Sequence, residues 1–424
     1  MFKKRIPLVS GKSESIFAVK SGKPFISRFQ LTRRQRGTIF SQFVKLITIT
    51  EAVLKDIEKS IVERKDIQGL FDALKKRGYQ ISGPTLRDNA VIYDQISSID
   101  ELPIGWTDTQ EKGNYRLTKG NKSSLFGYVV GPYSWKRFLY PPERKLMEVK
   151  REGTGFAVVK EEEAITKQAF VGVRPCELSA IAIQDKVLME GPYADASYKR
   201  NRTNAFIVAV NCLRPGGTCF CSSMKTGPAA TKGFDLAVTE MIEPKRHYFL
   251  VEVGSKEGSD VLKDVPNTAA GTEEIQTADK AIQKAAGKMG RSLDMKGIKE
   301  LLDDGFDDGQ WAAVAKRCLT CGNCTMVCPT CFCINVEDTT GLTGQQAQRF
   351  RKQDSCFTVE FSYIHGGSIR TSEMSRYRQW MMHKLAYWQD QFGLSGCVGC
   401  GRCITWCPVG IDITEEAGHY RKKG

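Results

Sequence analysis

The sequence carries one twelve-residue cysteine motif twice. The stretches CLTCGNCTMVCP (318–329) and CVGCGRCITWCP (397–408) both place four cysteines at the spacing CxxCxxCxxxC and then end in proline. This spacing is typical of chains that bind two [4Fe-4S] clusters, where three thiolates of one motif and the fourth thiolate of the other hold each cluster. Such a requirement constrains the fold of this region more than any apolar pattern in the chain.

The spacing predicts two ligand sets that cross between the motifs. The first set is Cys318, Cys321, Cys324 and Cys407, and the second is Cys397, Cys400, Cys403 and Cys328. A zinc-binding scaffold is the alternative, but tetrahedral zinc needs only four ligands, and the third regular cysteine of each motif is surplus to that need. Basic side chains such as Arg317, Arg402 and those of SRYRQWMMHK (375–384) either offset the negative charge of the clusters or lie on a solvated helix face.

Composition places the chain among cytoplasmic metal-binding proteins. An odd total of 15 cysteines, with two tight groups, argues against a disulfide framework. The chain has 41% hydrophobic and 26% charged residues, which is usual for a soluble globular protein. No apolar run approaches the roughly 18 residues of a membrane span, and the basic start MFKKRIPLVSGKS is not followed by an apolar signal core. We therefore expect a cytoplasmic protein without a membrane span.

Four segments follow from the patterns along the 424 residues: a basic arm (1–36), an α/β body (37–265), a helical linker (266–310) and a ferredoxin-like domain (311–424). The arm has ten Lys or Arg against one acid, Glu14, and so supplies +9 of the net charge of +14. It lacks the aromatic interleaving and groove-reading motifs of nucleic-acid binders, so we expect no nucleic-acid partner. We expect the arm either to be solvated or to lie on an acidic partner protein.

The body has the pattern of a mixed α/β fold. Residues 66–84 predict an amphipathic helix with Leu70, Phe71 and Leu74 on one face, and AVIYDQI and LFGYVVGP predict strands. The segment 168–253 predicts strand, helix and strand over 169–173, 177–190 and 205–211, which is a right-handed βαβ unit with parallel strands. The fold class is thus an α/β (α+β mixed) N-terminal body with a C-terminal ferredoxin-like domain that holds two [4Fe-4S] clusters.

A third cysteine set lies in this body. Cys176 and Cys212 each follow one of the parallel strands and should meet at the same sheet edge. With Cys219 and Cys221 they fit a further four-ligand site, for which we favour a [4Fe-4S] cluster over [2Fe-2S]; zinc or buried structural thiols are the alternatives. Three cysteines remain: Cys331, Cys333 and Cys356. They could be inert core residues, thiols beside a cluster, or ligands of a further cluster. We favour the first two roles, because a further cluster would need four thiols.

Several stretches in the same order resemble one family from about residue 80 to the C-terminus. They are LFGYVVGPYSWKRFLYPP, VGVRPCELSAIAI, TCFCSSM, CPTCFC, and SRYRQWMMHK leading into CVGCGRCITWCPVGIDI. Together they resemble the iron–sulfur beta subunit of sulfhydrogenases, the cytosolic bidirectional nickel–iron hydrogenases, and are similar to the related iron–sulfur chain of anaerobic sulfite reductase. Cys176, Cys212, Cys219 and Cys221 fall where that family has its extra cysteines, whereas the long basic start is less typical of it.

The resemblance implies an electron-transfer subunit that is not catalytic by itself. Its implied partners are a flavoprotein that binds FAD and NAD(P), and the small and large subunits of a hydrogenase; in the sulfite reductase alternative the terminal partner carries sirohaem. The sequence lacks GxGxxG after a strand, GxxxxGK[ST] and HExxH, and its four histidines are scattered. Three hypotheses remain beside the hydrogenase relay: a zinc scaffold, a nucleic-acid binder with a cluster, and an iron–sulfur chain of a sulfite reductase.

Overall fold

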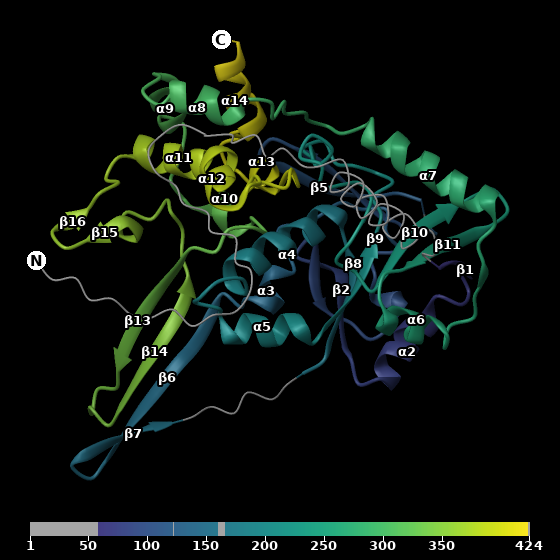
Figure 1. The fold of residues 1–424 in the computed structure, drawn as a ribbon, viewed down its shortest axis with the longest axis horizontal. Helices are drawn as coiled ribbons and strands as arrows, with labels where there is room; N and C mark the ends of the chain where they lie inside the picture. Colours follow the sequence, from purple (N-terminus) through teal and green to yellow (C-terminus); the bar gives the residue numbers. More distant parts are fainter. Residues whose placement is uncertain (1–57, 122, 160–165, 423–424) are drawn as a thin grey trace, which may run out of the picture. The chain divides into compact units, whose positions relative to one another are not determined.

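The computed structural model describes residues 58–121, 123–159 and 166–422, all within one compact unit, Ile57–Gly424. The basic arm (1–36) lies outside the described residues. Within them, an eight-stranded mixed sheet has the order β12-β1-β11-β10-β9-β8-β2-β3 (Figure 1). Its strands are β1 (Lys59–Glu63), β2 (Gln80–Arg87), β3 (Ala90–Gln95), β8 (Gln168–Val173), β9 (Ala205–Val210), β10 (Leu236–Ile242), β11 (His247–Val253) and β12 (Thr268–Ala269).

The predicted βαβ unit is confirmed at the middle of this sheet. Strands β8 and β9 pair in parallel, and α4 (Pro175–Leu188) connects them. Successive residues of β9 alternate between two cores: Phe206 and Val208 pack on one face of the sheet, and Ile207 and Ala209 on the other. Because both faces are covered, the strand is apolar throughout, as a parallel strand between two layers requires.

Helices cover both faces of the sheet. The predicted helix near residue 70 is confirmed as α2, with Leu70, Phe71 and Leu74 buried, and Gly78 follows it with φ +80°. Helices α2 and α6 pack together on the face of the sheet that carries Phe206 and Val208. Helices α3, α4 and α5 contribute to the core on the opposite face. Helix α7 packs beside β11. The bounds are α2 (Gln68–Lys76), α3 (Lys136–Leu139), α5 (Ala196–Thr203), α6 (Lys256–Leu262), α7 (Thr272–Ala286) and the 3-10 turn η1 (Ile99–Glu101).

The strand predicted over LFGYVVGP (125–132) is wrong, although AVIYDQI is confirmed as β3. The segment is buried but irregular, because side chains rather than a neighbouring strand satisfy its backbone. The N–H groups of Leu125 and Phe126 donate to the Glu240 carboxylate at 2.7 and 3.0 Å, and Arg174 donates to the Phe126 carbonyl at 2.9 Å. A buried irregular segment is tolerated only when its polar groups find such partners.

The C-terminal residues form a helical core and also share a sheet with the body. That second sheet has the order β13-β14-β6-β7, so β14 pairs with β6, which lies about 200 residues earlier in the chain. The segment 266–310 contains helices α7 and α8 (Ile298–Asp304), but it also holds strand β12 and adds Leu293, Ile298 and Leu302 to the C-terminal core. The elements are β6 (Glu143–Glu152), β7 (Gly155–Val159), β13 (Ile334–Thr340), β14 (Gln346–Gln353), α8 (Ile298–Asp304), α9 (Gln310–Ala315), α10 (Asn323–Met326), α11 (Glu373–Met382), the π-helical turn η3 (His383–Tyr387), α12 (Trp388–Phe392), α13 (Arg402–Thr405) and α14 (Ile413–Arg421).

Two short hairpins and one 3-10 turn complete the described elements: β4 (Trp106–Glu111) with β5 (Asn114–Lys119), β15 (Tyr363–Ile364) with β16 (Gly367–Ser368), and η2 (Glu360–Ser362). None of the described helices is both long and apolar enough to cross a membrane.

A buried ion pair joins the C-terminal part to the sheet. Arg402 Nη2 lies 2.5 Å from Glu177 Oε1, and the two side chains are 0% and 1% exposed. Glu177 sits in the first turn of α4, where it also accepts hydrogen bonds from Tyr93 at 2.7 Å and Trp135 at 3.2 Å. Arg402 Nε donates to the Gly131 carbonyl at 2.8 Å. The pair thus fixes the start of α4 to the second cysteine motif.

Replacing Arg402 with Met should destabilise the fold strongly, because it leaves the Glu177 carboxylate buried without its counter-charge. We expect a loss of about 3–5 kcal/mol in the free energy of unfolding. The matched control is Arg349→Met at the exposed pair Arg349–Asp338, for which the loss should be under about 1 kcal/mol. Denaturant unfolding of the full chain measures both values, and equal losses would contradict the role of the buried pair.

Candidate metal centres

The first predicted ligand set converges on one cavity. Cys318, Cys321 and Cys324 line it together with Cys407 of the second motif, and Cys403 borders it. The other walls are largely apolar and aromatic: Leu319, Phe357, Tyr377, Trp380, Val409 and Ile411. Cys321 is exposed, whereas Cys407 is buried. The structure therefore brings the fourth cysteine of one motif to the first three of the other, as the crossed arrangement requires.

The second predicted set also gathers in one place. Burial raises the pKa of the Cys403 thiol well above its usual range, and the neighbouring thiolates of Cys397, Cys400 and Cys328 add to that rise. Cys397 and Cys400 are buried and the other two are half-buried. Burial likewise raises the pKa of the Cys397 and Cys400 thiols. A hydrogen bond from Cys331 and the charge of Lys384 instead lower the pKa of the Cys328 thiol well below its usual range. A bound metal centre stabilises the thiolate form that all four ligands need.

Backbone amides already point at several of these sulfurs. Thr320 donates to Cys318 Sγ at 3.4 Å, Gly399 to Cys397 Sγ at 3.4 Å, and Ile411 to Cys407 Sγ at 3.3 Å. Hydrogen bonds of this kind stabilise thiolate ligands and tune the potential of iron–sulfur clusters. The donor set and its surroundings thus fit [4Fe-4S] clusters.

The third set lies directly against the second motif. Burial raises the pKa of the Cys176 thiol, and Cys221, Cys400 and Cys212 add to the rise, so these sulfurs are neighbours. Cys219, which is also buried, has its thiol 3.8 Å from the Cys400 carbonyl oxygen. The four predicted cysteines of the body therefore come together, and Cys400 of the second set adjoins them.

Two left-handed glycines allow this close approach. Gly399 and Gly401 have φ of +64° and +78°, and a Cβ on Gly399 would lie 2.7 Å from the Phe220 carbonyl carbon and oxygen. A Cβ on Gly401 would lie 2.5 Å from Thr218 Oγ1. Phe220 N–H donates to the Gly399 carbonyl at 2.8 Å. The backbone of the second motif is thus packed on the loop that carries Cys219.

The last three cysteines share a pocket beside the second set. Cys331, Cys333 and Cys356 line it with His383 and Lys384. A hydrogen bond from Cys356 lowers the pKa of the Cys333 thiol to about 7. Their grouping leaves open the predicted roles of thiols beside a cluster and of ligands to a further one.

In the ranges that the structure describes, no three His, Cys, Asp or Glu side chains converge closely enough to hold a single metal ion. A cubane cluster spaces its four thiolates farther apart than one tetrahedral ion does.

Two buried lysines face the cysteines. Lys384 belongs to the basic side chains of SRYRQWMMHK, for which the sequence predicts either a role in offsetting cluster charge or a place on a solvated helix face, whereas Lys136 is not among the predicted site residues. Lys384 Nζ donates to Cys328 Sγ at 3.2 Å, and Lys136 Nζ donates to the carbonyls of Cys328 and Cys331 at 3.0 and 3.1 Å. Both lysines occur in stretches that carry the family resemblance, at the end of SRYRQWMMHK and within YSWKRF. Their place in these stretches is the one sequence feature that points to a role for the two lysines. The sequence pattern does not distinguish a buried lysine from a solvated one.

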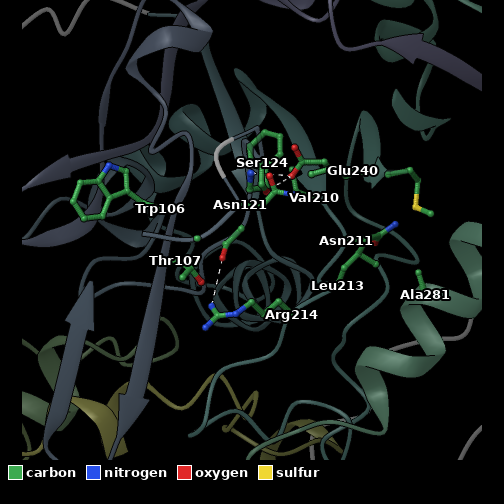
Figure 2. Close-up of a pocket in the computed structure, with 15 residues that line it drawn as sticks. Trp106, Thr107, Asn121, Ser124, Val210, Asn211, Leu213, Arg214, Glu240 and Ala281 are labelled. Carbon is green, nitrogen blue, oxygen red and sulfur yellow. Dashed lines mark hydrogen bonds between the residues drawn. The ribbon is translucent and has the colours of Figure 1, made fainter. Parts of the chain in front are cut away.

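A separate pocket of about 460 Å³ lies at the sheet edge near Cys212, where open α/β sheets usually bind ligands (Figure 2). Figure 2 shows Glu240 hydrogen-bonded to Ser124, at 2.9 Å, with Arg214 and Trp106 on the same pocket. Glu240 also holds the backbone of residues 125–126 and contacts His247 Nε2 at 3.0 Å. Its carboxylate is therefore occupied in positioning the buried segment.

Comparisons with known proteins agree with this geometry. Residues 317–411, which include both cysteine motifs, match the family model of the 4Fe-4S dicluster domain. The chain is 32% identical over 360 residues to the beta subunit of sulfhydrogenase 2 from Pyrococcus furiosus; the alignment covers 83% of this chain and 95% of that protein. No solved structure matches the chain.

Replacing Gly399 with Ala should separate the second motif from the Cys219 loop. The new Cβ meets the Phe220 backbone and must adopt a left-handed φ, so we expect a loss of about 3 kcal/mol in unfolding free energy. Gly418→Ala is the control: it lies inside α14 with open space around its Cβ, and Ala there should stabilise the helix by up to about 1 kcal/mol. Thermal unfolding compares them, and similar effects would refute the packing argument.

Proposed function

The chain belongs to the family of sulfhydrogenase beta subunits, and on that premise we propose that it relays single electrons between an FAD- and NAD(P)-binding flavoprotein and a nickel–iron hydrogenase module. The observation that carries the proposal is the meeting of Cys407 with the three cysteines of the first motif. This crossing is what a pair of neighbouring clusters needs and what a single-metal scaffold does not.

The proposed ligands are the sets that the structure groups. Cys318, Cys321, Cys324 and Cys407 would hold one [4Fe-4S] cluster, and Cys397, Cys400, Cys403 and Cys328 the second. Cys176, Cys212, Cys219 and Cys221 would hold a third cluster, [4Fe-4S] in our proposal. When bound, such clusters accept and release one electron at a time.

In this proposal the second site lies next to both of the others. Cys400 adjoins the third set, and Cys403 belongs to the second set but borders the cavity of the first. The third and second sites are largely buried, whereas the first reaches the surface at Cys321, beside Leu319, whose side chain is 61% exposed. We propose that one partner protein meets the chain at this exposed end, where a short distance to its own redox centre is possible.

Purification of the complex from its native cell without oxygen tests the proposed partners. We expect a flavoprotein and a nickel-containing pair of hydrogenase subunits to copurify with the chain, because the relay needs an electron source and an electron acceptor. Identification of the chains and analysis of metals give the result. Sirohaem in place of nickel would favour the sulfite reductase alternative, and zinc without iron and acid-labile sulfide would overturn the relay itself.

Replacing Cys328 with Ser tests the crossed ligation. Because Cys328 is proposed to bind the cluster of the other motif, Cys328→Ser should lose the same paramagnetic signal as Cys400→Ser, together with about four irons per chain. Cys324→Ser, only four residues away, is the matched control and should lose the other signal. Iron analysis and electron paramagnetic resonance (EPR) of the reduced variants decide the point. If Cys328→Ser instead reproduces Cys324→Ser, each motif binds its own cluster.

A further inference from the structure

We propose that Lys384 raises the reduction potential of the cluster ligated by Cys328, and does so more than for the cluster of the first set. This inference rests on the proposed function, because it assumes that Cys328 is a cluster ligand. Lys384 lies outside the cysteine sets, and by raising one reduction potential it would determine which cluster an electron occupies preferentially.

The ammonium group of Lys384 is in direct contact with the ligand sulfur. Its Nζ lies 3.2 Å from Cys328 Sγ and 3.2 Å from Thr330 Oγ1, and the residue is only 5% exposed. The Thr330 hydroxyl donates its one hydrogen to the Gly396 carbonyl at 2.8 Å, so it accepts from Lys384. Lys384 therefore donates to this sulfur and brings a positive charge to it. The Cys331 thiol and the Thr330 N–H group also donate to Cys328.

The backbone holds Lys384 in this position. It lies in the π-helical turn η3, a rare helical form that often occurs at functional sites. The carbonyl oxygen of Lys384 accepts hydrogen bonds from Gly396 N–H at 2.8 Å and from the Ser395 hydroxyl at 3.0 Å. These two residues immediately precede Cys397, the first cysteine of the second motif. The lysine and the second set are thus fixed to one another through a few residues of chain.

The charge of Lys384 is not cancelled by a carboxylate. Among the residues whose positions are described, neither Lys384 nor the buried Lys136 forms an ion pair with Asp or Glu, and both face the segment 328–331. A buried cation without a counter-ion is strongly unfavourable. A cluster with four thiolates is an anion, and its negative charge grows when it accepts an electron, so the uncompensated lysine favours the reduced state.

Two arginines near the sites have carboxylate partners. Arg402, beside Cys400, pairs with Glu177 at 2.5 Å. Arg376, whose charge acts on Cys318 of the first set, donates to the Thr371 carbonyl at 2.7 Å and lies 3.7 Å from Glu373. Lys384 contacts Cys328 of the second set directly, and its charge also acts on Cys324 of the first set. Its removal should therefore change the electric field most strongly at the second cluster.

The test compares midpoint potentials of the cluster-loaded full chain in an EPR-monitored redox titration. Lys384→Met should shift the midpoint of the second cluster to a more negative potential and shift that of the first cluster by less. Lys384→Arg, which keeps the charge, should restore most of the wild-type value. Lys299→Met is the matched control: this lysine pairs with Asp303 at 2.9 Å, away from the cysteines, and should shift neither midpoint. The signal lost in Cys321→Ser identifies the first cluster.

Several results would overturn the proposal. An unchanged midpoint in Lys384→Met with full iron content would do so, as would an equal shift at both clusters. Lys136→Met is a second variant and should give a smaller shift in the same direction at the second cluster. If both variants lose iron, the lysines hold the site together and do not tune it. Absence of any iron–sulfur signal in the wild-type chain would instead refute the proposed function.

Discussion

The backbone contact between the second cysteine motif and the Cys219 loop is the constraint on which the rest of the structure depends. A side chain at position 399 or 401 would collide with Phe220 or Thr218, so the main chain of the second motif packs directly on the loop that carries Cys219. The same contact makes the C-terminal part and the α/β sheet one unit, which strand β14 and the Arg402–Glu177 pair reinforce. Short separations between sites are what electron transfer through a chain of centres requires.

Charge compensation then differs from site to site. Arg402 pairs with Glu177 and also hydrogen-bonds Cys400. Arg174 donates to carbonyl groups of the buried segment 125–132 and also hydrogen-bonds Cys212. Lys384 contacts a cysteine sulfur and has no carboxylate partner among the described residues. Several buried cations therefore act on the cysteines, and the two arginines also hold the architecture together.

The sequence predicts what local patterns determine. The parallel strands β8 and β9, helix α4 and the buried face of α2 follow from periodicity, and the meeting of Cys407 with the first motif follows from spacing. The apolar residues of the buried segment 125–132 wrongly predict a strand, because its actual partner, Glu240, is distant in sequence and leaves no local pattern. The isolation of Lys384 from carboxylates is likewise a property of the packed fold and not of its neighbours in sequence.

The most direct test of the account is the EPR spectrum of the wild-type chain, purified without oxygen and then reduced. Two [4Fe-4S] clusters held by crossed cysteines must lie close together, so their spins should interact and broaden the spectrum beyond the sum of two isolated clusters. That interaction is the predicted result. A reduced sample with no iron–sulfur signal, or with sharp signals that show no interaction, would contradict the central claim that the two motifs jointly hold a pair of neighbouring clusters.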